Sequence, residues 1–224
     1  MNFTVDEDYI EVNPIHRIKL IKPSIERGEY SSDAVIRYLT LQQLDLMYHA
    51  LELVGNLLQL YALIKLLHQT GARISEVLAL NLTDIDIEKY RFQVIGKGNK
   101  KRWYFYRQEV ANLLREYIQF ERFFPSPALF TAQHPTTLKI TCLSYAQAYE
   151  DWVNTVTAIP ELKGARIHDL RHTFATERVG LMGIEELRAL MGHESIQTTL
   201  RYQKVTSAHA ESIAKQALET LNES

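Results

Sequence analysis

Cysteine and long apolar runs are both scarce in this sequence of 224 residues. The single cysteine, Cys142, excludes an internal disulfide and a cysteine-rich metal site, and we expect it to be a small buried residue without a role. No apolar run approaches the roughly eighteen residues of a membrane span, and the N-terminal sequence MNFTVDEDYIEV is acidic where a secretory signal is basic. The sequence therefore predicts a globular protein of the cytoplasm that does not enter a membrane.

Net positive charge is missing as well. The formal net charge of −2 and the pI near 6.5 argue against a nucleic-acid partner, because clustered Lys and Arg supply most non-specific affinity for nucleic acid. The distribution of the charge changes that conclusion. Residues 89–107 carry seven Lys and Arg and no acid, and this local +7 leaves −9 for the remainder of the chain. One face or hairpin is therefore expected to be strongly basic.

Helical periodicity dominates the chain, and a hydrophobic content of 46% is enough for a sizeable core. Residues 1–37 lack a long helical period and contain Pro14 and Pro23, so we interpret them as an N-terminal arm. Thr40 and Gln43 form a capping-box pair that predicts the start of the first helix. We expect helices near 40–51, 57–68, 72–80, 109–123, 143–156, 169–180, 184–191, 195–202 and 208–221. The second of these is expected to be largely buried, and Leu41, Phe120 and Tyr149 belong to the apolar helical patterns that predict core residues.

The strongest strand signal lies between the third and fourth of these helices. Alternating residues around Phe92 and Val94, and again around Trp103 and Phe105, flank a glycine-rich turn and predict an antiparallel hairpin. Lys97 lies at its tip between two glycines that let the backbone approach another surface. The expected fold class is mainly α with a small antiparallel β-sheet (α+β), and residues 125–137 are expected to be a loop with a short strand-like piece.

Polar residues concentrate in the stretch from Arg166 to His172. Pro160 and Gly164 precede it, so a loop is expected to lead into a helix that starts at about His168 or Asp169. A helix start offers unpaired backbone N–H groups and the positive end of the helix dipole, which suit a phosphate. His168 and Arg171 are three residues apart and share a helical face, whereas His172 is expected on a different face as a packed or supporting histidine.

Five motifs in this chain resemble, in the same order, the catalytic domain of the tyrosine recombinases, also called the phage integrase family. They are Gly71-Ala-Arg73-Ile-Ser-Glu76, Gly96-Lys97-Gly-Asn-Lys, His168-x-x-Arg171-His172, Gly192-His193, and Tyr202 nine residues further on. The resemblance covers about residues 38–206. It implies a recombinase catalytic-domain fold for that segment and a site-specific enzyme that cleaves and rejoins DNA.

The resemblance also implies the roles of individual residues. Tyr202 would attack a DNA phosphodiester and become linked to the 3′ phosphate, while Lys97 would protonate the leaving 5′ oxygen. Arg73 and Arg171 would match the two family arginines, and His168 and His193 the remaining positions. Glu76 would support the site, either through Arg73 or on the side of Arg171 and His168.

The residue types suit this chemistry on physical grounds. A pentacoordinate phosphorus carries extra negative charge, and guanidinium groups offer permanently charged, bidentate donors for it. A phenol has a pKa of about 10, so the Tyr202 proton must leave during attack, and His168 is the best candidate for the general base. A phosphotyrosine conserves the energy of the phosphodiester, so rejoining requires no cofactor, neither ATP nor metal. We therefore expect no metal-binding residues.

Double-stranded DNA is the expected partner. We expect Lys100, Lys101, Arg102, Arg166 and Arg201 to contact it. Residues 207–224 are expected to form a C-terminal helix or tail that is exchanged between protomers of a homo-oligomer on DNA, a tetrameric synapse. Accessory DNA-bending or directionality proteins are possible further partners, and DNA binding would place the protein in the nucleoid. Because family members usually carry a helical core-binding domain before the catalytic domain, the 37 preceding residues suggest a minimal form of the enzyme.

Three alternative functions remain open at this stage. A type IB topoisomerase uses the same phosphotyrosyl chemistry, although the expected final helix and the spacing from His168 to Tyr202 favour a recombinase. A DNA-binding regulatory partner of another recombinase would keep the fold without the catalysis. A metal nuclease is poorly supported, because no carboxylate cluster accompanies the motifs.

Overall fold

The computed structural model describes residues 36–53, 58–95, 101–207 and 211. Most of the expected N-terminal arm and most of the expected C-terminal tail therefore lie outside the described residues. The tip of the predicted hairpin, with Lys97 and Lys100, lies outside them as well.

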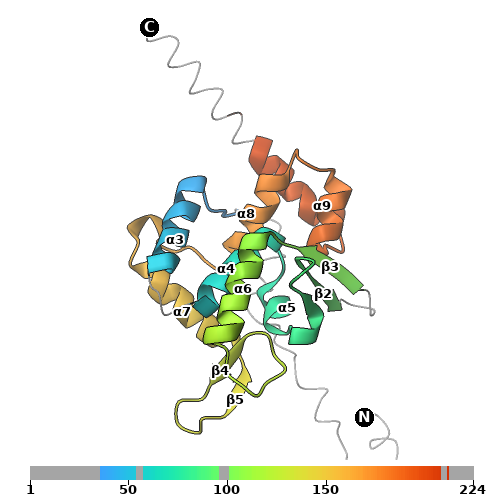
Figure 1. Cartoon of the computed structure of the whole chain (residues 1–224). Coiled ribbons are helices and arrows are strands. Elements are labelled where there is room, and N and C mark those ends of the chain that lie inside the picture. Colours follow the sequence, from blue (N-terminus) through green and yellow to red (C-terminus); the bar gives the residue numbers. More distant parts are fainter. Residues whose placement is uncertain (1–35, 54–57, 96–100, 208–210, 212–224) are drawn as a thin grey trace, which may run out of the picture. The chain divides into compact units, whose positions relative to one another are not determined.

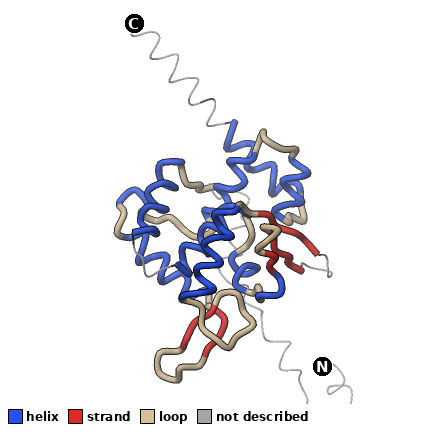
Figure 2. The backbone as a smooth tube through the Cα atoms, viewed as in Figure 1, coloured by secondary structure: helices blue, strands red, loops and turns tan. Residues whose placement is uncertain are grey.

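The described residues are mainly helical, with two small antiparallel sheets (Figures 1 and 2). The helices are α3 (Leu41–Leu53), α4 (Leu58–Thr70), α5 (Ile74–Leu78), α6 (Gln108–Phe120), α7 (Tyr145–Thr157), α8 (Asp169–Arg178), α9 (Ile184–Met191), the 3-10 turns η2 (Leu82–Asp84) and η4 (Pro160–Leu162), and a helix over 196–207. The strands are β1 (Ile85–Asp86), β2 (Arg91–Ile95), β3 (Lys101–Phe105), β4 (Thr131–Gln133) and β5 (Ile140–Cys142). The predicted fold class is confirmed.

Helix α4 lies at the centre of the core and contacts α3, α6, α7 and α8. Ala62, Leu63, Ile64 and Leu66 have no exposed surface, so apolar side chains cover the helix on nearly every side. A helix of this kind is stabilised by burial on all faces rather than on one stripe. Burying a Leu or Ile side chain contributes about 1.5–3 kcal/mol, which makes α4 the support on which the remaining helices are packed.

Local sequence signals fix several helix ends. Thr40 and Gln43 make the predicted reciprocal cap, in which the Thr40 N–H donates to Gln43 Oε1 at 3.0 Å and the Gln43 N–H donates to Thr40 Oγ1 at 3.2 Å. Gly71 follows the end of α4 with a φ of +63°, a left-handed conformation that closes the helix. The expected helices near 72–80, 109–123 and 169–180 are present and end earlier than predicted.

The predicted hairpin is formed by β2 and β3, and β1 adds a third strand that the sequence did not indicate. Phe92 pairs with Tyr104, and Val94 pairs with Arg102. Residues directly opposite one another in an antiparallel pair share a face of the sheet. Arg102 therefore shares the inner face with the buried side chains of Phe92, Val94 and Tyr104. Lys101 alternates to the outer face and is exposed.

Some expectations about the core and the sheets were wrong. Strands β4 and β5 form a second hairpin where a loop and a helix start were expected. Cys142 belongs to β5 and is exposed. Phe120 and Tyr149, expected in the core, are 69% and 43% exposed because they lie at the edge of their helical stripes. Leu41 is 80% exposed at the first position of α3 for the same reason.

Candidate functional site

The loop before α8 is fastened to the first turn of the helix by an ion pair. Arg166 donates from Nε and Nη2 to Asp169 Oδ1 at 3.0 and 2.7 Å, and its backbone N–H donates to Asp169 Oδ2 at 2.9 Å. Asp169 is buried, and its carboxylate lies where the helix dipole favours negative charge. His168 is the residue immediately before α8, as the sequence predicted. Arg166 thus fixes the helix start, and its predicted DNA contact stays a prediction.

Arg171 is held inside the protein by main-chain oxygens. It is only 2% exposed, and it donates from Nη1 to the Gly71 carbonyl and from Nη2 to the Met191 carbonyl at 2.7 Å. These carbonyls belong to the C-terminal ends of α4 and α9, where the helix dipole favours a cation. The guanidinium is therefore fixed in orientation by two helices that are far apart in the sequence.

Glu76 on α5 is the centre of a second cluster. It accepts hydrogen bonds from the Arg73 N–H (3.0 Å) and Arg73 Nη1 (3.3 Å), from Arg102 Nη2 (2.7 Å) and from the Tyr104 hydroxyl (2.9 Å). Burial alone would raise the pKa of Glu76, but the charge of Arg102, the backbone N–H and charge of Arg73, and the Tyr104 hydroxyl together lower it. The sequence left open whether Glu76 acts through Arg73 or on the side of Arg171 and His168. In the structure Glu76 is hydrogen-bonded to Arg73.

The same cluster gives Arg102 a role other than the expected DNA contact. Its guanidinium also lies over Gly192, where an added Cβ would overlap it. Arg102 therefore joins the basic hairpin to α5 and to the Gly-His motif, while its predicted DNA contact stays untested. Lys101 and the partly exposed Arg201 also stay predicted DNA contacts.

The Gly192-His193 pair ends α9. Gly192 is left-handed, with a φ of +63°, and its N–H caps the helix. The turn directs His193 into the protein, where it is 6% exposed and its Nδ1 lies 2.8 Å from Thr199 Oγ1. The requirement for a glycine at this position explains why the motif is Gly-His.

Tyr202 lies on the helix over 196–207 and is 3% exposed. Its ring stacks on the His193 ring with a centroid distance of 6.2 Å and an interplanar angle of 7°. Its hydroxyl lies 2.9 Å from His172 Nδ1. His172 was expected to be only a packed or supporting residue, so this contact was missed. The signal was present, because His168 and His172 are four residues apart and share a helical face.

The electrostatics show that these groups share one site. Burial lowers the pKa of His168 to about 4, with further contributions from the charges of Arg171, Arg166 and Arg73. Burial lowers the pKa of His193 to about 3, and Arg171 and Arg73 again contribute. Both histidines are therefore neutral at pH 7. The structure brings together Arg73, His168, Arg171, His193 and Tyr202 from four separate elements.

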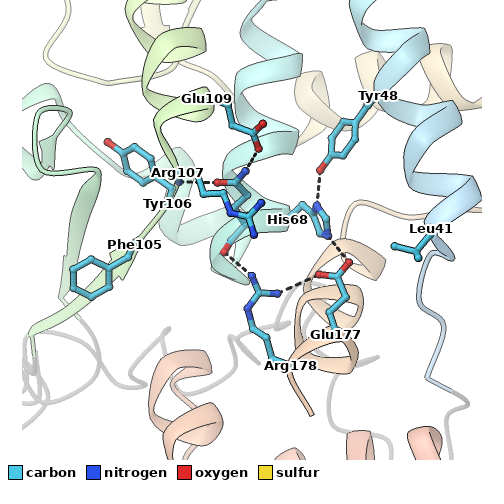
Figure 3. Close-up of a pocket in the computed structure, with 10 residues that line it drawn as sticks. Leu41, Tyr48, His68, Phe105, Tyr106, Arg107, Glu109, Glu177 and Arg178 are labelled. Carbon is cyan, nitrogen blue, oxygen red and sulfur yellow. Dashed lines mark hydrogen bonds and ion pairs between the residues drawn. The ribbon is translucent and has the colours of Figure 1, made fainter. Parts of the chain in front are cut away.

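A cavity of about 620 Å³ opens between α3, α4, α6 and α8, and its lining includes none of the residues of this cluster (Figure 3). Its lining residues are Leu41, Tyr48, His68, Gln69, Phe105, Tyr106, Arg107, Glu109, Glu177 and Arg178. Several of the polar side chains are hydrogen-bonded to one another. The Tyr48 hydroxyl lies 2.5 Å from His68 Nδ1, and His68 Nε2 lies 3.2 Å from Glu177 Oε1.

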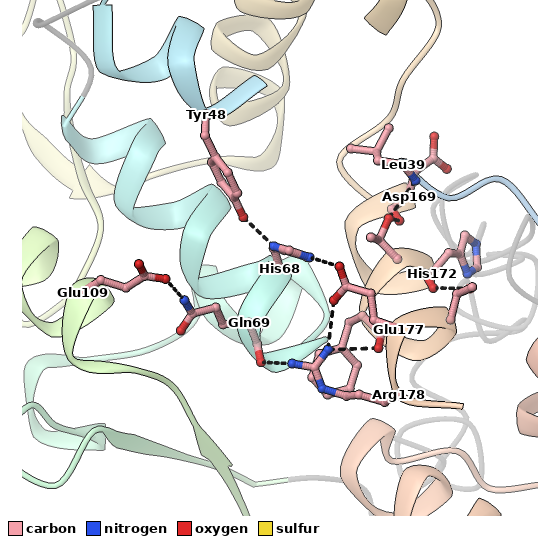
Figure 4. Close-up of polar contacts among 12 residues, drawn as sticks. Leu39, Tyr48, His68, Gln69, Glu109, Asp169, His172, Glu177 and Arg178 are labelled. Carbon is pink, nitrogen blue, oxygen red and sulfur yellow. Dashed lines mark hydrogen bonds and ion pairs between the residues drawn. The ribbon is translucent and has the colours of Figure 1, made fainter. Parts of the chain in front are cut away.

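Figure 4 shows how this network holds the C-terminal end of α8. Arg178 donates to Glu177 Oε2 at 3.2 Å and to the Gln69 carbonyl at 3.4 Å, and the Arg178 guanidinium lies 3.7 Å from the centroid of the Phe174 ring. Helix α8 is thus fastened to α4 at one end and carries His168, Arg171 and His172 at the other. The hydrogen bonds around the cavity therefore hold in place the helix that carries these candidate site residues.

Among the residues that the structure describes, no three His, Cys, Asp or Glu side chains are grouped as metal ligands. No helix in the same part of the chain is long and apolar enough to cross a membrane.

Comparison with known proteins identifies the class to which this fold and site belong. The model of the Phage integrase family matches residues 37–209, so the chain is a member of that family. Tyrosine recombinase XerC of Lactobacillus leichmannii is 31% identical over 157 residues, which cover 66% of this chain and 51% of that protein. XerC of Pediococcus pentosaceus is 26% identical over 220 residues, covering 91% and 67%. The chain spans about half the length of the first XerC relatives that it matches.

Solved structures show the same fold. The crystal structure of XerA recombinase matches 80% of this chain and 64% of its own with a TM-score of 0.66 and 23% identity. The catalytic domain of bacteriophage HP1 integrase matches 81% of this chain and 95% of its own with a TM-score of 0.54 and 24% identity. XerH site-specific recombinase bound to palindromic difH substrate, a post-cleavage complex, matches with a TM-score of 0.65 and 23% identity over 81% of this chain and 53% of its own.

Proposed function

We propose that this protein is a site-specific DNA recombinase that cleaves and rejoins strands through a 3′-phosphotyrosyl intermediate on Tyr202. The observation that carries the proposal is the convergence of one buried tyrosine with two arginines and three histidines from separate elements. Family membership and the XerC relatives support the same reaction class.

In the proposed reaction, Tyr202 Oη attacks the scissile phosphorus and the bond to the 5′ oxygen breaks. Arg73 and Arg171 stabilise the added negative charge, and the fixed orientation of Arg171 means that little reorganisation is needed during the reaction. His168 and His193, both neutral, bind the phosphate oxygens through N–H groups. Lys97, outside the described residues, protonates the leaving oxygen. Rejoining reverses these steps and needs neither ATP nor a metal ion, because the phosphotyrosine keeps the energy of the original bond.

Double-stranded DNA is the proposed substrate and partner. The protein is proposed to act as a tetrameric synapse, with residues 207–224 exchanged between protomers and with accessory DNA-bending or directionality proteins as further partners. The structure of XerH on its difH substrate supports DNA as the partner of this fold. Truncation after Ser207 is expected to impair recombination more than single-strand cleavage, and unchanged assembly on DNA would count against the exchange.

The proposal is tested with nicked suicide DNA substrates across a panel of candidate sites. Wild-type protein is expected to form a covalent complex that denaturing electrophoresis resolves, and Tyr202→Phe is expected to form none while still binding DNA. Tyr106→Phe is the matched control, because the Tyr106 hydroxyl is buried and has no hydrogen-bond partner among the described residues. Equal covalent capture by wild type and Tyr202→Phe would refute the assignment. Relaxation of supercoiled plasmid without recombinant product would favour the topoisomerase-like alternative.

A further inference from the structure

The Tyr202 hydroxyl faces a histidine outside the His-x-x-Arg pair of the family motif. His172 Nδ1 lies 2.9 Å from Tyr202 Oη, within ordinary hydrogen-bond distance for a nitrogen and a hydroxyl. Both residues are buried, His172 at 9% and Tyr202 at 3% exposed. Water therefore has little access to this hydrogen bond, and the histidine is placed to receive the phenol proton directly.

The His172 ring is fixed by its neighbours. The His168 ring meets it edge-on with a centroid distance of 4.7 Å and an interplanar angle of 89°. The Tyr202 ring lies at 5.7 Å with an angle of 47°. Since His168 is one helical turn before His172, both imidazoles extend from the same side of α8. The backbone of α8 thus sets the direction in which Nδ1 faces the hydroxyl.

We propose that His172 is the catalytic proton acceptor for Tyr202, a proposal that rests on the function proposed above. As Tyr202 Oη forms its bond to phosphorus, its proton passes to His172 Nδ1, and the bond from phosphorus to the 5′ oxygen breaks. The 5′ oxygen takes its proton from Lys97. In the rejoining step the 5′ hydroxyl attacks phosphorus and passes its proton back to Lys97, and His172 returns its proton to the departing Tyr202 oxygen.

This division of roles leaves His168 to the phosphate. A neutral imidazole at the start of α8, beside Arg171 and Arg166, is suited to donate a hydrogen bond to an anion. The bound phosphate also brings negative charge next to His172 and so offsets the cost of forming an imidazolium there. The sequence assigned the base to His168, and the geometry transfers that role to His172.

Two substitutions separate proton transfer from simple positioning. His172→Asn places an amide oxygen near the position of Nδ1, so it retains a hydrogen-bond acceptor but cannot take a proton. His172→Ala removes both properties. If His172 is the base, both variants slow single-turnover cleavage of a suicide substrate at saturating DNA by about 10²–10⁴-fold, with DNA affinity unchanged. His134→Asn, an exposed histidine on the β4–β5 hairpin, is the matched control and is expected to cleave like wild type.

A more acidic nucleophile provides the second readout. Replacing Tyr202 with a ring-fluorinated tyrosine lowers the need for a base, so the rate deficit of His172→Asn is expected to shrink at least about tenfold. Wild-type cleavage by His172→Asn, or an equal effect of fluorination on wild type and variant, would overturn the proposal and leave His172 a positioning residue. Absence of Tyr202-dependent capture in the wild-type protein would instead reject the underlying function, so the two failures are distinguishable.

Discussion

Gly71 is the position where a single methyl group should damage both the fold and the site. Its φ of +63° is unfavourable for any residue with a Cβ, and a Cβ built there would lie 2.6 Å from Phe174 Cγ and closer still to Cδ1. The Gly71 carbonyl also accepts a hydrogen bond from Arg171. Gly71→Ala therefore strains the backbone, displaces a buried aromatic ring and moves an oxygen that orients a candidate catalytic arginine.

The size of the effect follows from two terms. Placing an L-residue in the left-handed region costs about 1–2 kcal/mol. Overpacking a closed core adds about 1–3 kcal/mol, because Phe174 is only 3% exposed and its ring is held by the Arg178 guanidinium. The expected loss of unfolding free energy is about 2–5 kcal/mol. For a chain of this size that lowers Tm by about 4–20 °C.

Gly180→Ala is the matched control for the backbone term. Gly180 has a φ of +85°, and an added Cβ there meets nothing within 4 Å. It should lose only about 1–2 kcal/mol, the strain of the left-handed backbone. Urea unfolding at pH 7 measures both variants, and suicide-substrate cleavage at a temperature where both are folded measures the site.

The expected outcome is a clear difference between the two variants. Gly71→Ala should be less stable than Gly180→Ala by about 1–3 kcal/mol, and it should cleave more slowly even when fully folded. Equal stability of the two variants would show that Phe174 moves aside without cost. Undiminished cleavage by folded Gly71→Ala would show that the Gly71 carbonyl does not orient Arg171.

Three further predictions concern the Glu76 cluster and the basic hairpin. Glu76→Gln should lose about 1.5–3 kcal/mol of unfolding free energy at pH 7. The folded-state pKa of Glu76 lies below its ordinary value of 4.5, so this stabilisation is present above about pH 4.5 and is lost as the pH falls further. In urea unfolding from pH 7 to pH 3, the unfolding free energies of wild type and Glu76→Gln should therefore converge. Gly192→Ala should disrupt the Arg102–Glu76 pair and slow cleavage. In a double-mutant cycle, the loss of cleavage rate in the Gly192→Ala, Arg102→Ala double variant should be smaller than the two single losses combined. Strict additivity of the two losses would contradict the contact between Arg102 and Gly192. DNA affinity should fall steeply with salt despite the acidic pI, with log K declining by about 0.9 per log unit of salt for each phosphate contacted, and a flat dependence in filter binding would remove the hairpin from the interface.

Structural features that depend on residues close together in the sequence were predicted correctly. The Thr40–Gln43 cap, the buried α4 and the β2–β3 hairpin all follow from residue spacing of a few positions, and each is confirmed. Prediction was weaker for β4 and β5, because three-residue strands leave too short a pattern to recognise. The exposure of Phe120 was mispredicted because a helical stripe shows which side is apolar and not where the core ends.

The sequence by itself determined the family, the order of the motifs and the helix start at His168. Those features depend on residue identity and on spacing along one chain. Only the tertiary structure decided that Arg102 faces inward and donates to Glu76, because strand register places Arg102 on the inner face of the sheet. It alone also set His172 against Tyr202, a contact between residues thirty positions apart that packing of α8 against the helix over 196–207 creates.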